Sequence, residues 1–402
     1  MGIPNVLISG SGIAGPAAAS WLAAAGWDVT VVERFDHVRD EGQNVDVRGV
    51  GREVIRRMGL EDAVRAEHTS ETGMTFIGPG GRPVASFPVG AEDSAPTAEL
   101  EILRGRLARL LHDHSAASAE YVFGDRITAL HEDGRGVHVD FAHGPDRRFD
   151  AVVIAEGARS RTRGLVLPEA RVHELGLLWA YFTIPRTADD DRQWRMHLGG
   201  RGRIVHLRPD NLGSTRAMLS LRSDVLGFDR LDREGIVEVL RATFGDLGWE
   251  TPRILDALEN NSPGDTALHV DQIAQIRLPV WHRGRVAVLG DAAWCAGPFG
   301  TGTTSALAGA YVLAGELGAT PDEVPAAFAR YERLLRPMTG AAQKSVPAHP
   351  RSAWQRALLH TGFRALAHPV GRTLARVTGL GPSLPVQDLV LPDYRFRLPA
   401  RS

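Results

Sequence analysis

The 402-residue chain is 43% hydrophobic and 23% charged, with a formal net charge of -2. This composition is typical of a globular enzyme with two interleaved domains and a tail, and the near-neutral charge excludes a global field favouring nucleic acid or an anionic membrane. The single cysteine, Cys295, excludes an intrachain disulfide and a cysteine-based metal site, so we expect no metal and a cytoplasmic location. The sequence contains no run of about 20 apolar residues, so we expect no membrane-spanning helix.

The first predicted strand, residues 3–8, runs into a glycine turn, a helix of small residues and a second strand that ends at Glu33. In this order the G-x-G-x-x-G pattern predicts a dinucleotide site. Gly10 permits the tight turn, Gly12 lets a pyrophosphate approach the backbone, and Gly15 lets the helix pack on the sheet. Glu33 is placed to accept ribose hydroxyls and to repel a 2′-phosphate, which favours FAD or NAD over NADP. The predicted cofactor contacts of this unit are Gly10, Ser11, Gly12, Ile13, Ala14, Gly15, Glu33 and Arg34.

Two later strands also end in glycine turns. Residues 149–166 run from an apolar strand into Glu156-Gly157, and residues 285–305 run into Gly290-Asp291 and then into a helix rich in alanine and glycine. Turns at the carboxyl ends of neighbouring strands form a crevice for a ligand, and a helix N-terminus offers N–H groups to an electron-rich ring edge. Asp291 is placed to accept hydrogen bonds from a ribitol chain. The contacts predicted here are Gly157, Asp291, Gly300, Thr301, Gly302, Thr303 and Thr304.

With these three motifs in order, the chain resembles the single-component (group A) FAD-dependent aromatic hydroxylases of the para-hydroxybenzoate hydroxylase fold, over about residues 1–340. Residues 100–111 resemble the helix whose arginine, here Arg104, reaches the flavin, and residues 41–60 resemble the loop beside the isoalloxazine. The chain is most similar in look to hydroxylases of tetracyclines and polyketides, enzymes of antibiotic biosynthesis. The resemblance implies bound FAD, transient reduction by NADH or NADPH, and hydroxylation of a small aromatic or polyketide-type molecule through a flavin C4a-hydroperoxide.

The chain departs from the pattern of this family at Trp294, over Thr301 to Thr304, where the family often has Gln-Gly and then Asn, and at Gly309. Trp294 follows Gly-Asp-Ala-Ala where the family often has histidine, and Gly309 stands where an acidic residue is common. Trp294 either walls the flavin and substrate cavity or packs between domains. Because polar partners near the ring are lost, three alternatives to hydroxylation stay open: Baeyer–Villiger oxygenation, a redox-neutral FAD-dependent cyclase of natural-product biosynthesis, and a non-catalytic flavin-binding protein.

The middle of the chain predicts an antiparallel sheet that covers the flavin, because short runs of strand composition alternate with turn residues. We expect an α/β protein with a discontinuous, Rossmann-like FAD-binding domain (1–72, 96–172 and 277–345), an inserted antiparallel-sheet substrate domain (73–95 and 173–276) and a C-terminal helical segment (346–402). The expected substrate-cavity residues are Trp179, Tyr181, Met196, His206, Arg216, Met218, Pro298 and Phe299. The candidate catalytic residues are Pro298, Phe299, His206 as a base, and Trp294. We expect a monomer or homodimer with no nucleic-acid or membrane partner.

Overall fold

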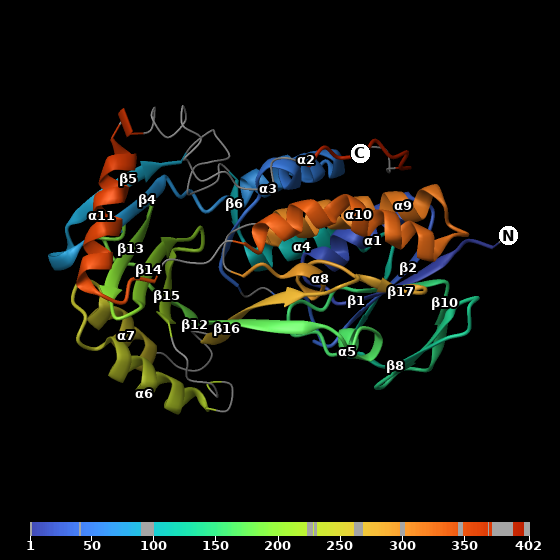
Figure 1. Ribbon diagram of the computed structural model, residues 1–402, viewed down its shortest axis with the longest axis horizontal. Helices are drawn as coiled ribbons and strands as arrows, with labels where there is room; N and C mark the ends of the chain where they lie inside the picture. Colours follow the sequence, from blue (N-terminus) through green and yellow to red (C-terminus); the bar gives the residue numbers. More distant parts are fainter. Residues whose placement is uncertain are drawn as a thin grey trace.

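The computed structural model describes residues 2–39, 42–89, 100–222, 228, 231–260, 268–297, 302–344, 349–368, 370–371 and 389–397. Figure 1 shows two lobes side by side, one built on a parallel sheet and the other on an antiparallel sheet. We call them the nucleotide lobe and the sheet lobe. The α/β fold class predicted from the sequence is confirmed, with both kinds of sheet present.

The nucleotide lobe is built on six strands in the order β17-β18-β11-β1-β2-β7. Neighbours from β18 to β7 are parallel, and β17 pairs antiparallel with β18. The strands are β1 (Asn5–Ser9), β2 (Asp28–Glu33), β7 (Glu120–Phe123), β11 (Ala151–Ile154), β17 (His282–Arg283) and β18 (Val286–Val288). Strands buried on both faces need continuous apolar runs, and β11 (AVVI) and β18 (VAV) are buried along their whole length.

Helices lie over this sheet in Figure 1, and α1 contacts both α4 and α9. They are α1 (Ala14–Ala24), α2 (Gly49–Met58), α3 (Glu61–Ala66), α4 (Arg104–Ser115), α5 (Thr162–Val166), α8 (Asp291–Trp294), α9 (Gly302–Ala319) and α10 (Val324–Ala342). Nearly all of α9 is buried, which explains its alanine and glycine content, since small side chains let neighbouring helices approach closely. Two small sheets complete the lobe: β3 (Asn44–Asp46) with β6 (Glu101–Leu103), and β8 (Ile127–Glu132), β9 (Val137–Phe141) and β10 (Arg147–Phe149).

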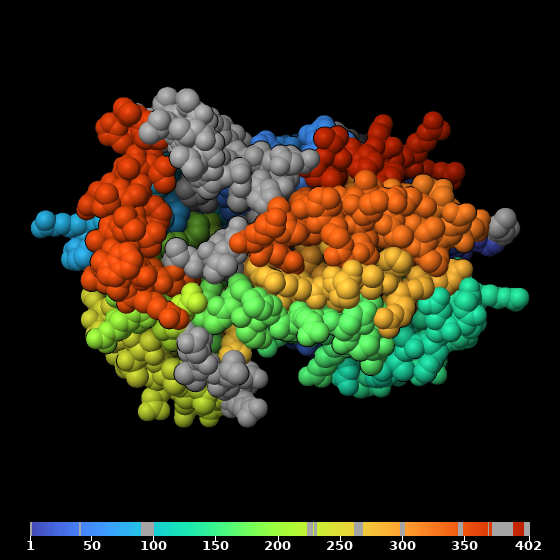
Figure 2. Space-filling view, viewed as in Figure 1, coloured from blue at the N-terminus to red at the C-terminus, as the bar shows by residue number. Residues whose placement is uncertain are grey.

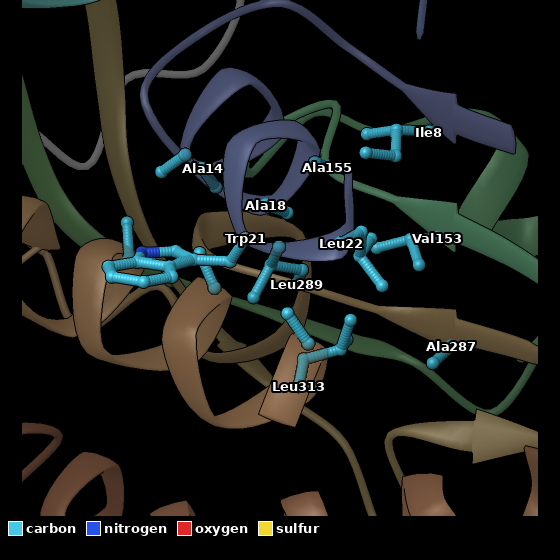
Figure 3. Packing of buried hydrophobic residues seen from close by; sticks show 14 of the residues in the cluster. Ile8, Ala14, Ala18, Trp21, Leu22, Val153, Ala155, Ala287, Leu289 and Leu313 are labelled. Atoms are coloured by element: carbon cyan, nitrogen blue, oxygen red, sulfur yellow. The ribbon is translucent and has the colours of Figure 1, made fainter. Parts of the chain in front are cut away.

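The core of the nucleotide lobe lies between α1, α9 and the strands. Figure 3 shows Trp21 and Leu22 of α1 close to Leu289 and Leu313. The Trp21 ring centroid lies 5.0 Å from that of Tyr311 and 4.7 Å from that of Phe396. Within the segment 346–402, residues 389–397 are not helical and pack on α1 and α9.

The sheet lobe contains seven strands in the order β16-β12-β15-β14-β13-β4-β5, all paired antiparallel except β13 with β4. The strands are β4 (Gly73–Ile77), β5 (Pro83–Pro88), β12 (Arg171–Pro185), β13 (Gln193–Gly200), β14 (Arg203–Pro209), β15 (Ser214–Arg222) and β16 (His269–Arg277), and a short 3-10 turn, η1 (Pro79–Gly81), joins β4 to β5. Helices α6 (Arg233–Phe244) and α7 (Thr251–Asn260) pack on one face of the sheet. Helix α11 (Ala353–Ala367) forms the outer wall of this lobe in Figure 2, and it contacts β5 and β13.

Candidate functional site

Three glycine turns meet at one edge of the parallel sheet. Strands β1, β11 and β18 are neighbours in register, so their carboxyl ends lie side by side. The backbone continues the contact beyond the strands: Ala155 N donates to Ser9 O at 2.7 Å, and Leu289 N donates to Ile154 O at 2.9 Å. The turns at 10–15, 156–163 and 290–291 therefore surround one crevice, the place where parallel α/β sheets bind ligands.

The first turn has the geometry of a dinucleotide-binding loop. Gly10 has a φ of +110°, and a Cβ there would lie 2.6 Å from the carbonyl oxygen of Ala155. A Cβ on Gly15 would collide with the carbonyl oxygen of Gly10, so α1 can begin this close to the strand only with glycine. A Cβ on Gly12 would meet just one atom within 4 Å, on the Arg104 side chain at 3.9 Å. The open backbone at Gly12 and the buried Ser11 hydroxyl, which has no hydrogen-bond partner among the described residues, both fit a bound pyrophosphate.

Glu33 closes the ribose side of this turn. Its carboxylate accepts hydrogen bonds from Ser11 N at 2.7 Å and from Phe35 N at 3.1 Å. These bonds fix the carboxylate beside the glycine turn. A carboxylate in this place accepts ribose hydroxyl protons and repels a 2′-phosphate.

Glu156 ties the second turn to the first. Its carboxylate accepts hydrogen bonds from the hydroxyls of Ser9 at 2.6 Å, Ser160 at 2.7 Å and Thr162 at 2.6 Å. Arg163 then reaches the third turn, because its guanidinium donates to Ala292 O at 3.0 Å and to Ala158 O at 2.9 Å. One acid and one arginine thus hold three distant segments together.

Asp291 begins α8 and stands next to the start of α9. A Cβ on Gly302 would lie 3.6 Å from its Oδ1, so the carboxylate is close to the N-terminus of that helix. The side chain is accessible within the cavity although protein atoms surround it. Burial raises the pKa of Asp291, and the nearby positive charge of Arg104 partly opposes the rise.

A cavity of about 2100 Å³ runs from the glycine turns to the sheet lobe. Single-ligand pockets are usually about 300–1,000 Å³, so this cavity can hold a dinucleotide and a second molecule. Twelve predicted cofactor residues line it: Gly10, Ser11, Gly12, Ile13, Ala14, Glu33, Arg34, Arg104, Gly157, Asp291, Gly302 and Thr303. Gly15 lies beneath the turn. Gly300 and Thr301, like Pro298 and Phe299, fall outside the described residues.

Two predicted site residues turn away from the cavity. Thr304 is buried against the start of α2, where its Oγ1 accepts a hydrogen bond from Arg48 N at 3.3 Å. Trp294 is 3% exposed and packs in the core, with its ring centroid 4.6 Å from that of Trp281. The expectation that Trp294 walls the cavity is therefore wrong, and its candidacy as a catalytic residue falls with it. Trp294 has the alternative role, packing, but it packs inside the nucleotide lobe and not between domains.

The second end of the cavity is one face of the antiparallel sheet. Alternate residues of a strand point to opposite faces, so Ala180, Phe182 and Val205 pack under α6 and α7 while their neighbours face the cavity. All six described residues that the sequence predicted for this wall line it: Trp179, Tyr181, Met196, His206, Arg216 and Met218. The Tyr181 hydroxyl donates to Asp271 Oδ2 at 2.9 Å, and burial raises the pKa of Tyr181 well above its ordinary value.

The base role predicted for His206 does not fit its surroundings. Trp194 Nε1 donates to His206 Nδ1 at 3.2 Å. Burial lowers the pKa of His206 well below its ordinary value, and His349 and Arg208 lower it further. Because an indole N–H is only a donor, Nδ1 of the neutral ring is already used as an acceptor and the proton sits on Nε2. With Nδ1 occupied and its protonation disfavoured, His206 is a hydrogen-bond donor through Nε2 and is not suited to act as a base.

Sequence reasoning missed a buried charged cluster at the same end. Arg208 pairs with Glu71 at 3.0 Å and with Glu101 at 2.6 Å, and its guanidinium lies 4.2 Å from the Trp194 ring centroid. Burial and the neighbouring Glu101 raise the pKa of Glu71 to about 9, against the opposing charge of Arg208. The three residues lie in separate elements, and no spacing in the sequence joins them. The cavity lining also includes Asn44, Asp46 and Arg48, from the segment 41–60 that resembles the loop beside the isoalloxazine. Cavity residues that the sequence did not indicate are Ser220, His349 and Phe363.

Comparison with known proteins agrees with this geometry. The FAD binding domain family matches residues 4–223. The chain is 40% identical to the flavin-dependent monooxygenase eupH of Phoma sp over 365 residues, which cover 83% of this chain and 84% of that protein. It is 31% identical to the FAD-dependent monooxygenase asL4 of Sarocladium schorii, over 97% and 98% of the two chains.

A solved structure repeats the whole arrangement. The crystal structure of the tetracycline destructase Tet(51) superposes with a TM-score of 0.77 and 27% identity, over 98% of this chain and all of that one. The chain belongs to the FAD-dependent monooxygenase family, and the match to the FAD binding domain family supports FAD as its cofactor. Within the described residues no helix is long and apolar enough to cross a membrane, and no group of three or more histidine, cysteine or acidic residues is arranged to hold a metal ion.

Proposed function

We propose that the protein uses NADH or NADPH and O₂ to place one oxygen atom on a small aromatic or polyketide-type molecule. The observation that carries the proposal is that a single cavity joins the three glycine turns to the aromatic and methionine face of the sheet. The reaction balances as substrate, O₂, NAD(P)H and a proton giving hydroxylated product, NAD(P)⁺ and water. Bound FAD supplies the redox chemistry, and the chain supplies binding, orientation and exclusion of water.

The residues of the cavity support each part of this proposal. Gly12, Ser11 and Glu33 offer backbone, hydroxyl and carboxylate to the phosphates and ribose of FAD. Trp179 and Met218 offer flat and adaptable apolar surface to a ring system. The name of Tet(51) adds tetracyclines to the aromatic and polyketide-type compounds to be tested.

The redox-neutral cyclase drew its support from polar residues lost near Trp294 and Thr304. Trp294 lies in the core, where a Cβ on Gly309 would lie 2.8 Å from its Cη2, and Thr304 is buried against the start of α2. Neither side chain faces the cavity, and no described feature favours the cyclase over oxygen transfer.

The test determines whether an oxygen atom of O₂ enters the product. Purified protein is expected to be yellow, to oxidise NADH or NADPH faster in the presence of a substrate, and to yield a product heavier by one oxygen that carries ¹⁸O when ¹⁸O₂ is supplied. The connectivity of the product separates hydroxylation from Baeyer–Villiger insertion. A colourless preparation that does not take up FAD would overturn the proposal. Bound FAD that neither nicotinamide reduces, with an isomeric product, would replace it with the cyclase.

A further inference from the structure

One side chain at the far end of the cavity combines burial with an unused hydrogen-bond donor. His206 of β14 lies opposite Met196 of β13 and opposite Met218 of β15 in the sheet register. It lines the cavity and is 5% exposed. A polar group held among thioether side chains is costly unless it is hydrogen-bonded.

The hydrogen bond from Trp194 decides which nitrogen of His206 carries the proton. Nδ1 accepts from Trp194 Nε1 at 3.2 Å, so Nε2 bears the hydrogen of the neutral ring. Among the described residues, this is the hydrogen bond that the side chain of His206 makes. The charged and titratable groups that face it are His349 and Arg208, both of which disfavour its protonation. His349 itself is held by a 2.6 Å hydrogen bond between its Nε2 and Ser220 Oγ.

We propose that the Nε2–H of His206 binds an acceptor oxygen of the substrate, so that the substrate is a flat ring compound bearing a carbonyl or phenolate oxygen. This inference rests on the proposed function, which makes the cavity the substrate site. In this proposal the ring system of the substrate lies against Met196 and Met218. The substrate oxygen accepts a hydrogen bond from the Nε2–H of His206, which no described residue uses. Trp194 is a positioning residue, because the hydrogen bond from its indole keeps the proton of His206 on Nε2.

Two probes that differ only in carbonyl oxygens test the inference. Anthraquinone-2-sulfonate and anthracene-2-sulfonate share a three-ring frame and a solubilising sulfonate. Their dissociation constants for the full-length, FAD-loaded protein are measured by titration calorimetry. We expect the wild type to prefer the quinone by roughly three- to tenfold, the worth of one neutral hydrogen bond.

Variants at two positions separate recognition from folding. His206→Phe keeps the ring and removes the N–H, so both probes are expected to bind equally. His206→Gln places an amide N–H near the position of Nε2 and is expected to keep the preference for the quinone. Trp194→Phe frees Nδ1 and is expected to weaken the preference without abolishing binding.

Equal affinity of the wild type for the two probes, failure to bind either, or a preference that survives in His206→Phe would each overturn the inference. FAD content and NAD(P)H-dependent O₂ uptake are recorded on the same preparations. Absence of bound FAD or of NAD(P)H-dependent O₂ uptake would count against the proposed function. The difference in dissociation constant between the two probes tests only the role of His206. The two failures are therefore distinguishable.

Discussion

The indole of Trp294 occupies the space that Gly309 leaves free of a side chain. A Cβ built on Gly309 would lie 2.8 Å from Cη2 of Trp294 and 3.0 Å from Cδ1 of Leu289. Trp281 closes the other side, with ring centroids 4.6 Å apart. The large residue on α8 and the absent side chain on α9 therefore form one packing unit in the core, beneath the FAD crevice.

Gly309→Ala is expected to destabilise the protein by about 1–3 kcal/mol, because it overpacks a full core. Thermal melting of the FAD-loaded protein measures the loss. Gly340→Ala is the matched control: Gly340 also lies in a long helix, but a Cβ there meets nothing within 4 Å. Alanine favours a helix by about 1 kcal/mol over glycine, so this variant is expected to melt no lower than the wild type. A Gly309→Ala protein as stable as the Gly340→Ala control would contradict the packing unit.

Asp291→Ala is expected to weaken FAD retention by about 1.5–3 kcal/mol, because a charged acceptor is lost from the crevice. The dissociation constant, measured by flavin release on dilution, is expected to rise by roughly 10- to 150-fold. Asp256→Ala on the exposed face of α7 is the control and should leave it unchanged. FAD release that stays the same in Asp291→Ala would remove Asp291 from the cofactor site.

Glu156→Ala is expected to weaken both the fold and FAD binding, because three hydroxyl groups lose their shared acceptor. Removing one hydrogen bond to a charged group costs about 1.5–3 kcal/mol. Glu156→Gln keeps the length of the side chain and is expected to lie between alanine and the wild type. Melting of the apoprotein and FAD titration report the two effects, and an apoprotein of unchanged stability would show that the carboxylate does not hold the turns together.

The stability of the protein is expected to fall as the pH rises from about 5 to 9, in part through Glu71. Its pKa is raised in the folded protein to about 9 from an ordinary value of 4.5, so in this range the folded state holds a proton that the unfolded state has lost. The slope is at most about 1.4 kcal/mol per pH unit for one proton. Glu71→Gln is expected to flatten the pH dependence of the melting temperature.

Glu53→Gln is the control for this effect. The neighbouring Arg56 and Arg57 lower the pKa of Glu53 to about 2, so that carboxyl stays ionised from pH 5 to 9 in both the folded and unfolded states. Replacing it should leave the slope unchanged. An equal slope in the wild type and in Glu71→Gln would mean that Glu71 is ionised in the folded protein.

Local patterns predicted much of the site. The glycine turn at 10–15 and Glu33 were predicted because they lie within one short unit of strand, turn, helix and second strand. The wall residues Trp179, Tyr181 and Met218 lie in runs of strand composition, from which the sequence predicted the covering sheet, and alternation along each strand places them on the cavity face. The alternation also holds across neighbouring strands once their register is fixed.

Contacts between distant segments were not predictable. The sequence left open whether Trp294 walls the cavity or packs in a core, because nothing in it pairs Trp294 with Gly309 on the next helix. The cluster of Arg208, Glu71 and Glu101 was missed because charged residues in a sequence usually indicate solvent-exposed positions. Such contacts become visible only when the helices, strands and loops that carry the residues are in place.

Phe396 packs against Trp21 with the two rings tilted by 46°, so helix α1 contacts a segment that lies very far from it in the sequence. Arg397 N also donates to Ala24 O at 2.8 Å. Contacts of such long sequence separation form late, because chain entropy must be lost before they stabilise anything. The helix that begins at the first glycine turn therefore acquires its last cover late in folding, when a segment far along the chain has packed on it.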